Sequence, residues 1–226
     1  MLKLLMNQAD LAAASAQTEG ISLKFIDLAI KGGWIMIPIL ALSFIAVYIF
    51  IDRYFAIKKA GEVDPALLEK VKMHITTGKI DVAIALCKSN SSPAARMLEK
   101  GISRIGKPLN DVNAAIENVG NHEILKLEKG LPVLASVAGG APMIGFLGTV
   151  LGMIRAFFDM ASAGSNIDVT LLSTGIYQAL VTTVAGLIVG ITAFFAYNIL
   201  VADIEKVVFK LEMITSDFMD LLNEPA

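Results

Sequence analysis

The chain has 226 residues, a formal net charge of −2 and 55% hydrophobic residues. A soluble domain is usually nearer about 45–50% apolar, and a chain so close to neutral has no general attraction to nucleic acid. Its single cysteine excludes an intrachain disulfide framework and argues against a thiol–zinc site.

Residues 1–31 form the first segment. Within it, residues 1–17 contain a lysine, a short apolar stretch and several small residues, which resembles a weak signal peptide. The apolar stretch is shorter than the roughly 7–15 residues of a normal signal-peptide core. We therefore expect a periplasmic segment that is either an interfacial helix or a disordered leader.

Three runs of the chain are apolar and free of charge: residues 34–51, 131–154 and 169–202. A helix needs about 20 mostly apolar residues to cross the hydrocarbon core of a bilayer. Three such runs as buried core helices would need a much larger soluble protein around them. The sequence therefore predicts an all-α membrane protein with transmembrane helices at 32–51, 131–156 and 173–201.

The positions of lysine and arginine predict the orientation of these helices. Thirteen of them lie between the first and second apolar runs, whereas residues 157–168 contain none. Because cytoplasmic loops carry the excess of Lys and Arg, we expect a cytoplasmic region at 52–130, a periplasmic loop at 157–172 and a cytoplasmic tail at 202–226. The N-terminus is then periplasmic and the C-terminus cytoplasmic.

The cytoplasmic region reads as a series of helices. Proline at the first helical position after a capping side chain is a start signal, and glycine commonly ends a helix. The expected starts are Asp64-Pro65, Ser92-Pro93 and Asn110 or Asp111, and the expected ends are Gly78 and Gly106.

The helical pattern continues beyond the third apolar run. From residue 204 to residue 222, apolar residues recur at spacings of three and four among charged ones. This predicts one long helix that leaves the membrane and presents an amphipathic stripe. Such a stripe needs a partner surface, either the helix that leads into the second span or another copy of the chain.

No catalytic constellation is evident. His122-Glu123 begins like a zinc-protease motif, but Lys126 stands where the second histidine belongs. The glycines near residue 148 lack the lysine of a phosphate-binding loop. We therefore expect neither an enzyme nor a cofactor or metal site.

The glycines of the second and third runs have a better explanation in helix packing. Within lipid, small residues promote association because they let helix backbones approach closely. The residues expected at such contacts are Pro142, Gly145, Gly148, Gly152, Gly175, Gly186 and Gly190.

Polar residues inside the third run form a second pattern. Thr174, Gln178 and Thr182 are spaced by four, which places them on one stripe of a helix. A glutamine amide inside a membrane has to face protein or water. Neither the second nor the third run contains an ionisable Asp, Glu, Lys, Arg or His. If protons cross here, the titrating group comes from another subunit.

Two segments carry a family resemblance. Residues 141–157 read APMIGFLGTVLGMIRAF, and residues 172–187 read LSTGIYQALVTTVAGL, with Tyr197-Asn198 following. Both resemble the signature of the MotA/TolQ/ExbB proton-channel family. The resemblance implies an inner-membrane pentamer in a Gram-negative-type bacterium. Such a pentamer encloses an ExbD-like or TolR-like one-span partner that carries a membrane aspartate.

The resemblance also assigns residues and a function. The family's pore-facing threonines correspond to Thr149 and Thr183, whereas the spacing alone favours Thr182 with Gln178. Well-known ExbB and TolQ members have glutamate where this chain has Gln178, and many have proline where it has Thr192. The expected function is that of a proton-channel subunit in an ExbB–ExbD-type motor. This motor uses the proton motive force to energise a TonB-like protein and outer-membrane transport. The alternatives are a TolQ-type motor for envelope integrity and a passive membrane scaffold.

Overall fold

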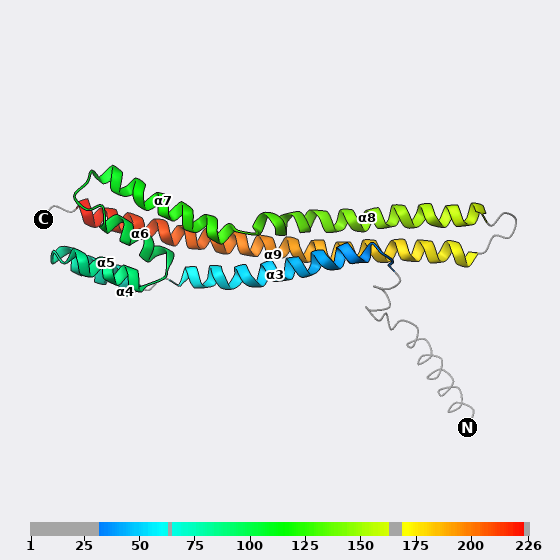
Figure 1. Cartoon of the computed structure of the whole chain (residues 1–226), viewed down its shortest axis with the longest axis horizontal. Coiled ribbons are helices and arrows are strands. Elements are labelled where there is room, and N and C mark those ends of the chain that lie inside the picture. Colours follow the sequence, from blue (N-terminus) through cyan, green and yellow to red (C-terminus); the bar gives the residue numbers. More distant parts are fainter. Residues whose placement is uncertain (1–31, 63–64, 163–168, 224–226) are drawn as a thin grey trace, which may run out of the picture. The chain divides into compact units, whose positions relative to one another are not determined.

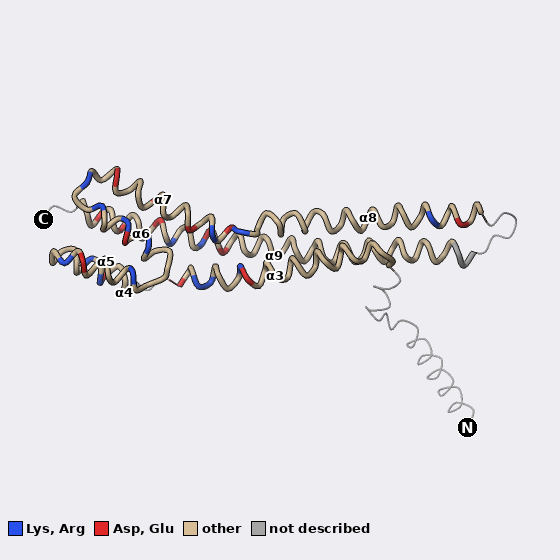
Figure 2. The backbone as a smooth tube through the Cα atoms, viewed as in Figure 1, with Lys and Arg blue, Asp and Glu red and all other residues tan. Residues whose placement is uncertain are grey.

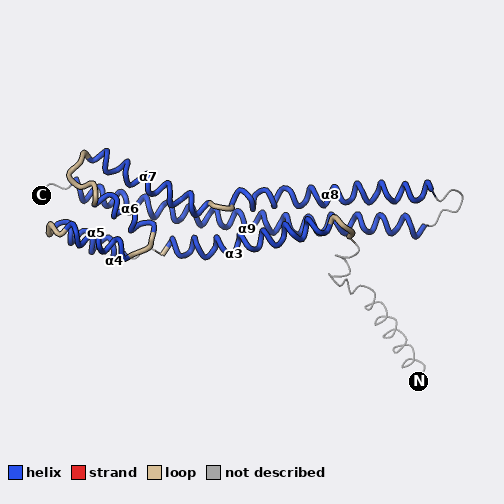
Figure 3. Tube along the Cα trace, in the orientation of Figure 1, coloured by secondary structure: helices blue, strands red, loops and turns tan. Residues whose placement is uncertain are grey.

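The structure is a computed structural model that describes residues 32–62, 65–162 and 169–223. Within these ranges every regular element is a helix and none is a strand (Figures 1 and 3). Three of the helices are long and apolar enough to cross a membrane. The predicted all-α fold with three such helices is confirmed.

The three long helices are α3 (Met36–Gly61), α8 (Leu131–Ser162) and α9 (Val169–Asn223). Helix α9 has 55 residues, which gives a length of about 80 Å at about 1.5 Å per residue. A bilayer core is only about 30 Å thick. Helix α9 therefore extends well beyond any membrane span, as the amphipathic pattern after residue 202 predicted.

The apolar parts of these helices expose large hydrophobic side chains. Phe44, Phe146 and Phe195 are all more than half exposed. Figure 2 shows the corresponding stretches of α3, α8 and α9 with almost no charged residues. Because a soluble protein rarely exposes apolar surface on this scale, these faces require lipid or other subunits as their surroundings.

The described chain divides into two compact units. The first contains the described residues 32–40, 142–162 and 169–187, and the second contains 41–62, 65–141 and 188–223. Helices α3, α8 and α9 contribute to both units. The second unit also contains four shorter helices: α4 (Pro65–Thr76), α5 (Ile80–Ser89), α6 (Pro93–Ile102) and α7 (Leu109–Glu128).

The starts of the short helices follow local chemistry. Ser92 caps α6 as predicted, since its Oγ accepts a hydrogen bond from the Ala95 amide at 3.2 Å. Asp64, the expected cap of α4, lies outside the described residues. The predicted start of α7 was wrong by one or two residues. Pro108 is the N-cap residue and makes no side-chain cap, while Asp111 lies in the first turn, where a carboxylate is favourable.

Helix α9 packs into the core of the second unit. Leu211 and Phe218 are completely or almost completely buried. A Cβ on Gly101 of α6 would lie 2.6 Å from a ring atom of Phe218 and 2.7 Å from Ile116 of α7. The glycine thus allows α6, α7 and α9 to meet. The amphipathic stripe of α9 finds its partner within the chain, at α6 and the helix that leads into α8.

A buried carboxylate also links these helices. Glu123 of α7 is only 6% exposed. It accepts hydrogen bonds from Arg96 Nη1 at 3.0 and 3.1 Å and from Lys126 Nζ at 2.7 Å. Two cations compensate the cost of burying this charge. Arg53 of α3 donates to the main-chain oxygen of Lys126 at 2.8 Å, which ties α3 to the same cluster.

The reactivity of the buried Cys87 thiol can be used to measure whether the second unit is folded. Burial, with a smaller contribution from Glu99, raises the pKa of its thiol to about 11. The thiolate is the nucleophile, and a free cysteine has a pKa of about 8.5. We expect the alkylation rate by iodoacetamide in the folded protein to rise about tenfold per pH unit up to pH 10, without a plateau near pH 9. The denatured chain should give a plateau near pH 9, and the same plateau in the folded protein would contradict the buried position.

Candidate ion-pathway site

The site lies in the first unit, where α8 and α9 approach closely. A Cβ on Gly145 would lie 2.8 Å from the Thr182 carbonyl oxygen and 3.2 Å from the Cα atoms of Thr183 and Gly186. These neighbours are backbone atoms, which cannot move aside as a flexible side chain does. Only a glycine at position 145 permits this separation of the two helices.

The contact continues toward residue 162 of α8. A Cβ on Gly152 would lie 2.9 Å from Ala179 Cβ, and one on Gly175 would lie 2.6 Å from Ala156 Cβ. Glycine and alanine thus alternate across the interface, which is the arrangement that brings membrane helices together. Among the other glycines expected at helix contacts, Gly190 is buried in the second unit.

Pro142 lies inside α8 without ending it. A proline removes one main-chain hydrogen bond and usually kinks a helix, but such residues are tolerated in membrane helices when neighbours satisfy the freed groups. Pro142 is half-buried and comes three residues before the closest backbone approach at Gly145.

Thr182 lies within the helix contact. It is 1% exposed, and its hydroxyl donates to the Ala179 carbonyl at 2.7 Å, with the Gly145 carbonyl at 3.5 Å. A side chain on Gly148 would collide with the Thr182 hydroxyl. In the isolated chain, this threonine packs between α8 and α9.

Thr183 and Thr149 lie nearer the surface of the helix pair. Both are half-buried. The Thr183 hydroxyl donates across the helices to the Gly145 carbonyl at 3.1 Å, whereas the Thr149 hydroxyl donates within α8 to the Phe146 carbonyl at 2.6 Å. Each hydroxyl oxygen keeps lone pairs that can accept a further hydrogen bond.

Gln178 makes a contact that spacing alone did not indicate. Its Nε2 donates to the Gly32 carbonyl at 3.4 Å, across 146 residues of sequence. Gly33 has φ +70°, and a Cβ there would collide with the Gln178 amide. The glycine pair at 32–33 therefore makes room for this amide at the entrance to α3. In the sequence, the two adjacent glycines were the only indication of a close contact at this point.

The predicted polar stripe is not uniform in its surroundings. Thr174 is exposed, Gln178 is half-buried, and Thr182 is buried. In the single chain these residues pass from the surface of α9 into its contact with α8. Their shared helical spacing therefore does not give them a shared environment.

Charge is nearly absent from this unit. Within residues 32–40, 142–162 and 169–187, the charged side chains are Arg155 and Asp159. They form an exposed pair at 3.9 Å, four residues apart on α8. The groups near Gly145 are hydroxyls, an amide and main-chain carbonyls, which bind water or a carboxyl group but do not titrate near neutral pH.

The backbone contact at Gly145 predicts a sharp effect of one methyl group. Gly145→Ala should destabilise the detergent-solubilised protein by about 1–3 kcal/mol, because the Cβ meets backbone and overpacks the interface. Gly139→Ala is the matched control on the same helix, since a Cβ there meets nothing within 4 Å. It should be neutral or stabilise by up to about 1 kcal/mol. Equal thermal unfolding midpoints for the two variants would contradict the close approach.

Comparison with known proteins identifies the family of the region that contains this site. Residues 89–213 match the MotA/TolQ/ExbB proton channel family, which covers more than half of the chain. That region contains α8 and most of α9, including Thr149, Gln178 and Thr183.

Three relatives illustrate the similarity. An ExbB-like biopolymer transport protein of Synechocystis is 26% identical over 198 residues, which are 79% of this chain and 71% of that protein. The biopolymer transport protein ExbB of Xanthomonas campestris is 34% identical over 110 residues, 48% of this chain and 43% of its own length. The Tol-Pal system protein TolQ of Haemophilus influenzae is 41% identical over 78 residues, 34% of either chain. The aligned region thus spans less than half of the last two proteins.

Two of these names describe biopolymer transport and the third a Tol-Pal system, and the family match covers α8 and most of α9. The chain therefore belongs to the MotA/TolQ/ExbB proton channel family.

Proposed function

We propose that the chain is the channel-forming subunit of an ExbB–ExbD-type motor in the inner membrane of a Gram-negative-type bacterium. The motor uses the proton motive force to energise a TonB-like protein for outer-membrane transport. The observation that carries the proposal is the α8–α9 contact at Gly145. There Thr183 hydrogen-bonds across the helices, and the apolar runs 131–154 and 169–202 contain no Asp, Glu, Lys, Arg or His.

The missing acid defines what the partner must supply. The second and third apolar runs contain no Asp, Glu, Lys, Arg or His, although intramembrane ionisable groups are the usual mark of a proton relay. A one-span ExbD-like or TolR-like subunit with a membrane aspartate provides the titrating group. Several copies of this chain, as a pentamer, enclose its span.

The hydroxyl geometry favours one protonation state of that aspartate. Thr149 and Thr183 direct their hydroxyl hydrogens to main-chain carbonyls, so their oxygens remain as acceptors. A protonated carboxyl group donates one hydrogen bond, whereas a carboxylate only accepts. The two threonines therefore stabilise the neutral acid or a water that donates to them. Gln178 can both donate and accept, and it adds a polar group without adding a charge.

The energy released by protons that cross the membrane is sufficient for a mechanical step of the motor. One charge that crosses 100 mV releases about 2.3 kcal/mol. A few protons per step, each carried on the partner aspartate past the neutral threonine surface, can move one set of subunits against the other.

The orientation completes this proposal. The N-terminus is periplasmic, residues 52–130 and 202–226 are cytoplasmic, and residues 157–172 form a periplasmic loop. Support comes from the lysines and arginines concentrated between α3 and α8.

A TolQ-type role in envelope integrity is the second candidate function, and the similarity to a TolQ protein over 78 residues favours it. The identity of the partner distinguishes the two roles.

Partner identification is the direct test. The tagged chain should be extracted from its native membrane in mild detergents, and the co-purifying proteins identified by mass spectrometry. We expect a one-span protein with an aspartate inside its span. A TonB-like companion would favour the ExbB role, and Tol-Pal components would favour the TolQ role. A homo-oligomer with only soluble companions in every detergent would favour a passive scaffold and overturn the proposal.

The threonine hydroxyls can be tested separately. Thr149→Val and Thr183→Val each remove a hydroxyl at nearly constant volume, and proton-driven uptake should fall about tenfold or more if about 1.4 kcal/mol of stabilisation is lost. Thr192→Val is the matched control, because Thr192 is exposed and bonds to its own helix at Ile188. Uptake is measured per assembled complex, with assembly checked by native electrophoresis. Full activity of both variants would exclude the proposed role of the hydroxyls.

A further inference from the structure

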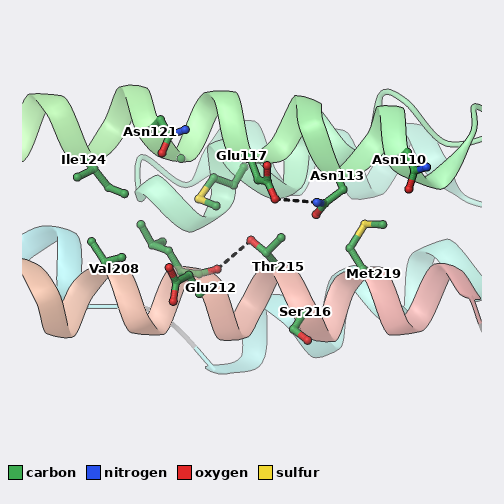
Figure 4. Close-up of a pocket in the computed structure, with 13 residues that line it drawn as sticks. Asn110, Asn113, Glu117, Asn121, Ile124, Val208, Glu212, Thr215, Ser216 and Met219 are labelled. Atoms are coloured by element: carbon green, nitrogen blue, oxygen red, sulfur yellow. Dashed lines mark hydrogen bonds between the residues drawn. The ribbon is translucent and has the colours of Figure 1, made fainter.

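A groove runs between α7 and α9 in the second unit. Its main cavity has a volume of about 730 Å³, and an adjoining cavity of about 310 Å³ shares Val208 and Glu212 with it. Figure 4 shows α7 and α9 on opposite sides of the main cavity, with Asn113 and Glu117 facing Glu212 and Thr215. The two cavities form one continuous surface along the extension of α9.

The groove is acidic. Four carboxylates line it, Glu117 and Glu128 from the α7 side and Glu205 and Glu212 from α9, and its lining includes no Lys, Arg or His. Four like charges along one groove raise its negative potential and attract a basic partner surface.

Exposed apolar side chains accompany these charges. Phe209 lines the adjoining cavity and is 63% exposed, and Met213, one turn further along α9, is 51% exposed. Aromatic residues and methionine are enriched in protein interfaces. The combination of carboxylates and large apolar groups suits a protein partner better than a small cation.

The same chain carries the complementary surface. Helices α4, α5 and α6 with their connections, residues 65–107, contain eight Lys and Arg against three Asp and Glu. In contrast, residues 109–128 and 203–223 contain nine Asp and Glu against three Lys and Arg. Figure 2 marks these charges along the helices. We call residues 65–107 the basic layer. In this layer Lys79 and Lys100 are exposed, and so are the apolar Met73 and Val82.

Met97 is the only residue of the basic layer among the residues that line the groove of the same chain. Met97 of α6 is part of the lining of the main cavity and contacts the α7 backbone side at Gly120. Helix α6 therefore packs at the bottom of the groove, and none of its charged residues is among the lining residues. A neighbouring copy offers the same basic layer without this restriction.

We propose that the acidic groove between α7 and α9 receives the basic α4–α6 layer of a neighbouring copy of this chain. Each copy then uses two different surfaces, which makes the contact heterologous, and repetition of a heterologous contact closes into a ring when the rotation permits. Complementary charge sets the order and direction of the copies. This inference rests on the homo-oligomer in the proposed function and specifies its interface outside the membrane.

Cysteine cross-linking between two tagged forms of the full-length chain tests the contact. In a Cys87→Ser background, one form carries Ser216→Cys at the groove, and the other carries Thr77→Cys or Ser103→Cys on the basic layer; all three positions are exposed. A short bis-maleimide in native membranes should join the two tags. Asn118→Cys, exposed on α7 outside the groove, is the matched control, and its yield should be at least about fivefold lower for a specific docked contact.

Other outcomes overturn the inference. A dominant cross-link between two chains that both carry Ser216→Cys would mean a symmetric contact, and capture of a different protein would mean that the groove holds another partner. Absence of every cross-link in an oligomer of normal native mass would reject this interface and leave the proposed function intact. Loss of the oligomer itself would instead count against the proposed function.

Charge reversal supplies an independent test. Glu117→Lys with Glu212→Lys should lower the cross-linking yield at least about fivefold, because like charges then face each other. Adding Lys79→Glu and Lys100→Glu to the same chain should restore the yield to within about twofold. Failure of the combined variant to recover, with the oligomer still present, would show that the charges do not pair between copies.

Discussion

The close backbone approach of α8 and α9 at Gly145 is the constraint on which the candidate site depends. A methyl group at Gly145 would meet the backbone of Thr182, Thr183 and Gly186. Without that space the Thr183 hydroxyl would not reach the Gly145 carbonyl at 3.1 Å. The small residue thus has two consequences, because it fixes the separation of the helices and also leaves a main-chain carbonyl available to a side chain of the other helix.

The apolar runs and the rest of the chain avoid the cost of buried charge in different ways. The apolar runs contain no charged residue, so nothing there pays the high cost of a charge in hydrocarbon. Outside them, Glu123 is buried but surrounded by Arg96 and Lys126, and Arg53 links the end of α3 to the same cluster through the Lys126 carbonyl. The ion pairs that join helices of the second unit therefore lie outside the apolar runs.

The sequence predicted the features that depend on a single helix, and it did not predict the contacts that depend on how two helices pack. Hydropathy and length gave the three apolar helices, and the spacing of residues 204–222 gave the extension of α9. Neighbouring Thr182 and Thr183 differ by about 100° around the helix, and only the position of α8 determines which of them is buried. The contact between Gln178 and Gly32 spans 146 residues, and periodicity within α9 carries no information about it. Helix α7 begins after Pro108, whereas the polar side chains of Asn110 and Asp111 had predicted a start one or two residues later.

Gln178 makes a contact that depends on its side chain being a neutral amide. A carboxylate in its place would face the Gly32 carbonyl, and two acceptors repel unless the acid is protonated. The amide donates to that carbonyl at 3.4 Å and keeps an oxygen that can accept. It thus stabilises the entrance to α3 at any pH, whereas an acid would do so only while it holds a proton. In the proposed motor this amide adds no titrating group to the subunit, so the partner's carboxyl is the group that carries the proton.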